Sequence, residues 1–168
     1  MTTSRGEQGA DRAEGPFAPA DAAAMVFSGK QAAALDSKNR VGLPAKFREE
    51  IPSGTPLRAL PHPDGCVALY PEPEFHRFRD ELKRKRTDDD AYSDEAVRQI
   101  FSRTEKLTPD ATHRILVTED LKEAAGITKD VMFVGVDNRI ELWDAGRWAA
   151  REALRQESLQ KLSRTYFR

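Results

Sequence analysis

The chain has 168 residues, of which 39% are hydrophobic and 33% charged. This length suits one compact domain or two small ones. Because a half-chain module of this composition would bury little apolar surface alone, we expect the parts to pack together and the chain to oligomerise. Its formal charge of −1 argues mildly against a nucleic-acid binder, but phosphate contacts depend on where the cations lie. The single cysteine, Cys66, excludes an internal disulfide and indicates a cytoplasmic compartment, and no apolar run approaches the roughly 18 residues of a membrane span.

The N-terminal residues 1–24 are small, polar and charged, and Phe17 is their only aromatic side chain. Such a segment cannot offset the entropy of ordering it, so we expect a disordered extension. Met25 opens a more apolar stretch. The sequence leaves open whether translation begins at Met1 or at Met25.

The first informative element is a polar turn, Asp36–Arg40. A short strand over residues 41–43 follows it and ends at Pro44. Residues 45–50 resemble one or two helical turns. Proline suits the first helical position, where its missing N–H costs nothing, so we place Pro44 there.

A hairpin and two helices are predicted next. The hairpin strands are Leu57–Leu60 and Cys66–Tyr70, joined by a proline–glycine turn at residues 62–65. Apolar residues at helical spacing indicate helices over residues 71–86 and 94–105. The chain therefore alternates short strands with short helices in its first half.

The second half repeats the first. Residues 110–114 read Asp-Ala-Thr-His-Arg and echo Asp36–Arg40 at an offset of 74 residues (110 minus 36). The strand, helix, hairpin and aromatic positions that follow the turn recur in the same order. The second hairpin turns at Asp137-Asn138, where asparagine tolerates a positive φ, and Asp144 can cap a final helix from Ala145 to about Leu162. This self-similarity indicates a duplication, with the two copies forming a pseudo-symmetric pair around a shared core.

The repeat divides the chain into five parts. They are a disordered extension at 1–24, a first repeat at 27–75, linking helices at 76–100, a second repeat at 101–148 and a C-terminal helix at 149–168.

The Asp-x-x-x-Arg turns are the candidate binding sites. Asp36 and Asp110 can support the turns while the arginines face outward, although a local salt bridge alone would explain the same pattern. Arginine suits phosphate or guanine because it presents several donors in a rigid fork. The candidate DNA-binding residues are Lys38, Arg40, Lys46, Arg48 and Arg114.

Other residue patterns favour structural roles. The aromatics Tyr70, Phe75, Trp143 and Trp148 could stack on bases, but their equivalent places in both repeats favour packing. The basic run at residues 83–86 is more typical of a solvated helix end than of a DNA patch. The three histidines are scattered, which predicts neither a metal site nor a cofactor. The sequence shows no nucleophile, phosphate-binding or paired-carboxylate motif, so we expect no enzyme and no small-molecule substrate.

The chain resembles the MraZ family. Two sets of motifs, one in each repeat, occur in the same order as in that family and at the same separation along the chain. The matching segments are Phe27 with Gly29, Leu35–Arg40, Pro44–Glu49, Asp64–Pro71, Gly126–Val131 and Val134–Trp143. The resemblance implies a mainly β, α+β fold of two AbrB-like swapped-hairpin (β-α-β-β) repeats with pseudo-two-fold symmetry, plus linking and C-terminal helices. It also implies a nucleoid-associated transcriptional regulator. Such a regulator would form ring-shaped homo-oligomers and bind tandem short repeats in its own promoter region, upstream of a bacterial division and cell-wall gene cluster.

Several residues depart from the family pattern. Asn39 and His113 stand where the family has glycine before the motif arginine, and both residue types visit the left-handed conformation more readily than most. Arg103 replaces a glycine and Thr118 a proline, so the departures affect the expected DNA contacts of the second repeat more than those of the first.

Two alternatives remain. The repeats could serve only assembly, in a ring or partner-binding protein without specific DNA recognition, or the chain could be an AbrB-like antitoxin, although antitoxins usually carry one repeat. The distinguishing feature is whether Lys38, Arg40, Lys46 and Arg48 share one exposed face.

Overall fold

The computed structural model describes residues 24–85 and 94–167. The extension predicted at residues 1–24 therefore lies, except for Ala24, outside the described residues. None of the described helices is long and apolar enough to span a membrane.

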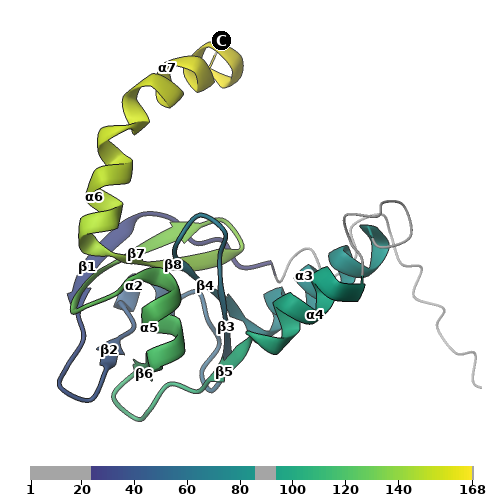
Figure 1. Cartoon of the computed structure of the whole chain (residues 1–168), viewed down its shortest axis with the longest axis vertical. Coiled ribbons are helices and arrows are strands. Elements are labelled where there is room, and N and C mark those ends of the chain that lie inside the picture. The colour runs from purple at the N-terminus through teal and green to yellow at the C-terminus, as the bar shows by residue number, and fades with distance from the viewer. Residues whose placement is uncertain (1–23, 86–93, 168) are drawn as a thin grey trace, which may run out of the picture.

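An antiparallel six-stranded sheet forms the centre of the molecule, with the strand order β1-β7-β8-β4-β3-β5 (Figure 1). The order is palindromic, because β1, β3 and β4 of the first repeat correspond to β5, β7 and β8 of the second. The strands are β1 (Lys30–Ala34), β3 (Leu57–Pro61), β4 (Val67–Pro71), β5 (Glu105–Leu107), β7 (Asp130–Val136) and β8 (Arg139–Asp144).

Each repeat lends its first strand to the hairpin of the other. β1 pairs with β7, and β5 pairs with β3, while β4 and β8 meet at the pseudo-two-fold axis. The expected α+β fold of two related repeats is confirmed. The exchange of first strands is consistent with a swapped-hairpin arrangement.

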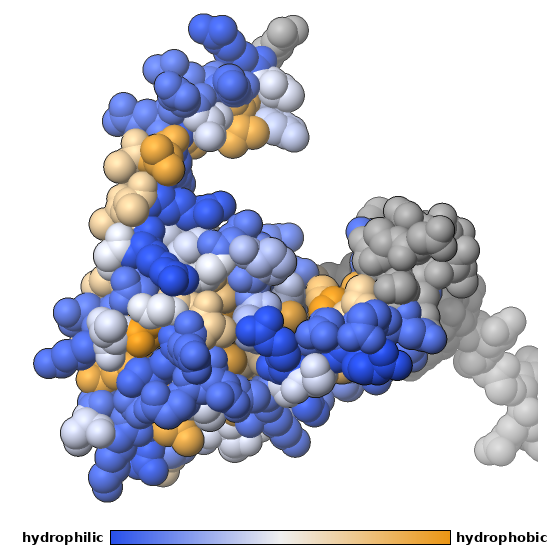
Figure 2. Space-filling model, in the orientation of Figure 1, coloured by the Kyte–Doolittle hydropathy of each residue, from blue (hydrophilic) through white to orange (hydrophobic). Residues whose placement is uncertain are grey.

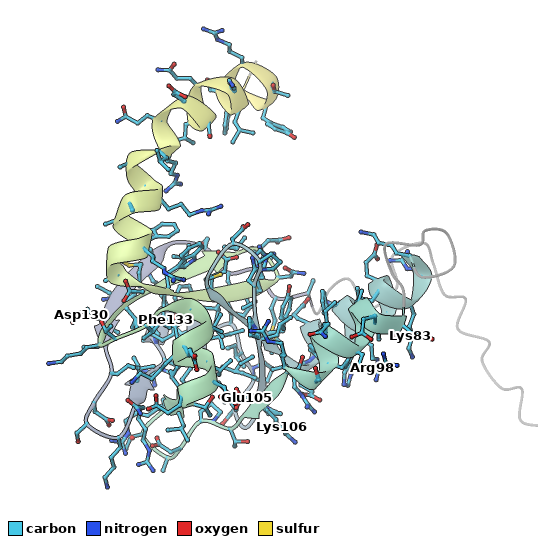
Figure 3. All side chains as sticks on the ribbon, in the orientation of Figure 1. Lys83, Arg98, Glu105, Lys106, Asp130 and Phe133 are labelled. Carbon is cyan, nitrogen blue, oxygen red and sulfur yellow. The ribbon has the colours of Figure 1, made fainter. Side chains whose placement is uncertain are left out.

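A two-stranded ribbon and two short helices cover one face of the sheet. The ribbon joins β2 (Arg40–Gly42) to β6 (Arg114–Leu116) in antiparallel register. The helices are α2 (Ala45–Arg48) and α5 (Glu119–Ala125). They enclose the main core, in which Phe47 contacts the Phe27 and Phe133 rings at centroid distances of 6.3 and 6.5 Å. Figure 3 shows Phe133 inside the body.

Helices α3 (Glu72–Lys85) and α4 (Asp94–Ser102) form an arm that projects from the body beside β3 and β5 (Figure 1). At its base Tyr70 stacks on Phe78 at 5.1 Å between ring centroids, and Phe75 lies 6.0 Å from Phe78. On the C-terminal side Trp143 lies 5.7 Å from Trp148. The packing role predicted for these aromatics is confirmed.

The C-terminus forms a second arm of two helices, not the single helix expected. Asp144 caps α6 (Ala145–Ala153) by accepting hydrogen bonds from the amides of Gly146 and Arg147. The helix ends at Ala153, and after Leu154 a further helix, α7 (Arg155–Tyr166), continues away from the body (Figure 1). Exposed large apolar side chains on this arm are Leu154, Leu159, Leu162, Tyr166 and Phe167.

Three local predictions were wrong. The helix predicted to reach Glu105 ends at Ser102, because Glu105–Leu107 pair with β3 as a short edge strand. Pro44 precedes the first helical residue, and its ψ of 142° is extended. In the second hairpin Asp137, not Asn138, takes the positive φ (59°), and Asp137 also pairs with Phe27.

Candidate nucleic-acid interface

The turn before β2 is held by one carboxylate. Asp36 Oδ1 accepts hydrogen bonds from the amides of Lys38 (2.8 Å) and Arg40 (2.9 Å). These bonds favour the ionised carboxyl and, led by the Arg40 amide, lower the pKa of Asp36. Asn39 occupies the left-handed region at φ 60°, so the turn closes without glycine.

The turn before β6 has the same construction. Asp110 Oδ1 accepts hydrogen bonds at 2.9 Å from the amides of Thr112 and Arg114, and the Thr112 hydroxyl donates to the same oxygen. These bonds, with the Arg114 amide contributing most, lower the pKa of Asp110 to about 2. His113 takes the left-handed conformation at φ 63°. Both turns therefore rest on backbone bonds to an aspartate.

The β2–β6 ribbon presents the two motif arginines to solvent. Val41 and Ile115 are paired across the ribbon and are 2% and 0% exposed, so they point into the core. Side chains alternate along a strand, and the outer face therefore carries Arg40 and Arg114. Leu116 lies opposite Arg40 on this face and is 48% exposed.

The two guanidinium groups differ in their partners. Arg114 Nε lies 3.0 Å from Asp110 Oδ2, and its Nη1 lies 3.6 Å from Asp36 Oδ2. Arg114 therefore bridges the carboxylates of both turns. Within residues 24–85 and 94–167 the Arg40 guanidinium forms no hydrogen bond or ion pair, and it is half-exposed.

The remaining cations predicted for the site lie apart from this face. Lys46 is exposed, but its ammonium donates to the carbonyl of Lys30 and lies 5.4 Å from the Phe47 ring centroid. Arg48 is half-buried and lines a crevice of about 430 Å³ together with Asp110 and His113. The four cations of the basic segment therefore do not share one exposed face: Lys38 lies in the first turn and Arg40 on the ribbon, while Lys46 and Arg48 lie elsewhere.

The first turn is also tied to the second repeat, which sequence reasoning missed. Asn39 donates its side-chain amide to Glu119 and accepts from the Lys122 ammonium, each at 3.0 Å. Thr118, which stands where the family has proline, caps α5 by accepting from the Leu121 amide and donates to Glu105 at 2.9 Å. A threonine directly before an acidic first turn is a recognisable capping signal.

The end of the molecule that carries the ribbon is mostly hydrophilic with small apolar spots, and further apolar residues lie on the C-terminal arm and at the base of the α3–α4 arm (Figure 2). Lys83 and Arg98 lie on the α3–α4 arm, away from the ribbon (Figure 3). The described part of the basic run, residues 83–85, is therefore separate from the motif arginines.

One cluster of metal-ligating residues emerges that sequence spacing did not indicate. A ring nitrogen of His62, Cys66 Sγ and a Glu141 oxygen lie within 4.8 Å of one another. Glu141 comes from the second repeat, which is why no local motif reveals the group.

Comparison with known proteins identifies relatives across most of the chain. The family model described as "MraZ protein, putative antitoxin-like" matches residues 26–95 and 100–168. The protein named Transcriptional regulator MraZ in Acidovorax sp. (strain JS42) is 34% identical over 131 residues, which cover 76% of this chain and 89% of that one. Its namesake in Methylibium petroleiphilum is 36% identical over 134 residues, 78% of this chain and 88% of that one.

Proposed function

The chain belongs to the MraZ family of transcriptional regulators, and on that premise we propose that it regulates the promoter upstream of its own gene, in a bacterial division and cell-wall gene cluster. It binds tandem short DNA repeats there as a ring-shaped homo-oligomer. The reading surface is the outer face of the β2–β6 ribbon with its two preceding turns.

The observation that carries this proposal is the state of Arg40. Asp36 accepts a hydrogen bond from the Arg40 amide at 2.9 Å, so the backbone from which the side chain projects is held in place before any ligand binds. The Arg40 side chain is half-exposed and forms no ion pair with a described residue, and Lys38, two residues earlier in the turn, is exposed. An arginine with a held backbone and an unpaired guanidinium can donate hydrogen bonds to a phosphate or to the edge of a guanine.

The other candidates take supporting roles in the same proposal. Arg114 lies on the same face, but its contacts with Asp36 and Asp110 must give way before it reaches DNA. Lys46 and Arg48 lie outside the ribbon face and add flanking positive charge. The first repeat therefore makes the stronger contacts.

Assembly compensates for the small size of each contact surface. One chain offers a single ribbon, and several ribbons on tandem sites bind together at a raised effective concentration. The apolar side chains exposed along α6–α7 support assembly, because such patches are typical of protein–protein contacts.

The test is fluorescence anisotropy of a labelled duplex from the upstream region against a shuffled duplex of equal length and composition. We expect tighter binding to the natural duplex and a steep loss of affinity with salt. Equal affinity for both duplexes in an assembled protein would contradict specific recognition and favour a structural ring or an antitoxin-like partner binder.

A further inference from the structure

A group of three side chains lies on the face of the sheet opposite the ribbon. Along β4 and β8, Val67 and Ile140 point into the main core, so their neighbours Cys66 and Glu141 point to the other face. His62, in the turn that follows β3, reaches the same place. The ligand atoms of the three residues lie within 4.8 Å of one another.

We propose that His62, Cys66 and Glu141 bind a Zn²⁺ ion, with water in the fourth position. Zinc takes nitrogen, sulfur and oxygen ligands at about 2.0–2.3 Å in a tetrahedral arrangement, so two ligands of one ion lie about 3.3–3.8 Å apart. The three ligand atoms, which lie within 4.8 Å of one another, reach that spacing by closing through roughly an ångström. His62 is half-exposed at the turn after β3, where its Nδ1 accepts a hydrogen bond from the Asp64 amide at 3.1 Å and lies 3.7 Å from Asp64 Oδ2.

The surroundings of Glu141 suit a ligand. Arg139 donates to Oε2 from Nε (3.1 Å) and Nη2 (3.0 Å), and Trp143 Nε1 donates to Oε1 (3.1 Å). Carboxylates that bind metals are commonly oriented by such outer hydrogen bonds. Among the described residues, Oε1 accepts one hydrogen bond and keeps accepting capacity for an ion, whereas Oε2 is engaged by Arg139.

Cys66 supplies the soft ligand. Its side chain is buried, with 1% of the residue exposed, and it forms no hydrogen bond with another described residue. Burial, followed by the charge of Glu141, raises the pKa of the thiol to about 12, so the metal-free thiol is protonated. A bound divalent cation reverses this balance and makes the thiolate the stable form.

The ion would connect the two repeats. His62 and Cys66 belong to the first hairpin and Glu141 to the second, at the β4–β8 junction where Ala68 pairs with Glu141. Zinc should therefore raise the thermal stability of the body. DNA binding should be unchanged, because Arg40 and Arg114 lie on the other side of the sheet.

The experiment is a Co²⁺ titration of the full-length protein, followed by absorbance and by displacement with Zn²⁺. We expect one-to-one binding with a sulfur-to-cobalt charge-transfer band in the near ultraviolet. Cys66→Ser should abolish the band. His62→Ala should weaken binding at least about tenfold, since even outer-sphere changes at metal sites cost about 10–100-fold. His76→Ala is the matched control, because His76 is exposed on α3 outside the cluster.

Several results would overturn the proposal. They are the absence of a charge-transfer band in the wild type, unchanged Co²⁺ affinity in His62→Ala, or an equal zinc-induced shift of melting temperature in the wild type and Cys66→Ser. Circular dichroism of each variant checks folding, and His62→Ala replaces a half-exposed turn side chain, so it keeps the test valid if Cys66→Ser is unstable. DNA affinity measured in parallel separates failure here from failure of the proposed regulatory function.

Discussion

Replacing Arg40 with alanine should weaken binding to the upstream DNA more than replacing Arg114. The two side chains share the outer face of the ribbon, and both follow an aspartate-supported turn. Arg114 divides its charge between Asp110 at 3.0 Å and Asp36 at 3.6 Å, whereas Arg40 has no ion pair among the described residues. Arg114 must therefore exchange existing partners for DNA, and Arg40 need not.

The expected size follows from the type of contact that is lost. A lost phosphate contact should flatten the dependence of log affinity on log salt by about one unit of slope. A lost bidentate contact with guanine should cost about 1–3 kcal/mol, or about 5-fold to 150-fold in affinity. Arg114→Ala should show a smaller change in both quantities, because the gain from its DNA contact is reduced by the ion pairs it breaks.

The assay is anisotropy with the upstream duplex at several salt concentrations, on the wild type, Arg40→Ala and Arg114→Ala. Arg98→Ala is the control, since Arg98 is an exposed arginine on α4, away from the ribbon (Figure 3). Sedimentation checks that each variant assembles. Equal losses for Arg40→Ala and Arg114→Ala would refute the argument from ion pairing. No loss in either assembled variant would make the motif arginines structural and favour the assembly alternative.

Four further outcomes are expected. Asp110→Asn should be less stable than the wild type at neutral pH, because the pKa of Asp110 is about 2 in the folded protein and 3.8 without the fold, so the ionised carboxylate stabilises the fold. In urea denaturation this difference should vanish as the pH falls from about 4 to about 2, where the carboxylate becomes protonated. A pH-independent difference would contradict this cause. Thr118→Ala should cost about 1 kcal/mol in urea denaturation because α5 loses its cap, and no change would show that the cap is unimportant. Phe47→Ala should cost about 3–5 kcal/mol by the same measurement, since the ring is buried between Phe27 and Phe133; a loss under about 1 kcal/mol would mean that the core repacks. Ending the chain after Ala153 should reduce the number of subunits measured by sedimentation, while the circular dichroism of the body persists. An unchanged number of subunits would show that the α7 arm does not hold the oligomer together.

The turns were predictable from sequence because their chemistry is local. An aspartate can reach the amides two and four residues ahead, and the same pattern at residues 36–40 and 110–114 predicts the same turn twice. The left-handed conformation of Asn39 and His113 follows from the tolerance of these residue types. The capping of α6 by Asp144 is local in the same sense.

Contacts between the repeats were decided by the tertiary structure. The three-residue strand at Glu105–Leu107 has too little pattern of its own and exists because β3 supplies its hydrogen bonds. Asp36 of the first repeat lies within ion-pair distance of Arg114 of the second. Because of this contact, Arg114 has carboxylate partners that Arg40 lacks. The ammonium of Lys46 is drawn to a carbonyl of β1, away from the ribbon. Local hydrogen bonds depend on neighbours along the chain and can be predicted from them, whereas pairings across dozens of residues depend on which strands the fold brings together.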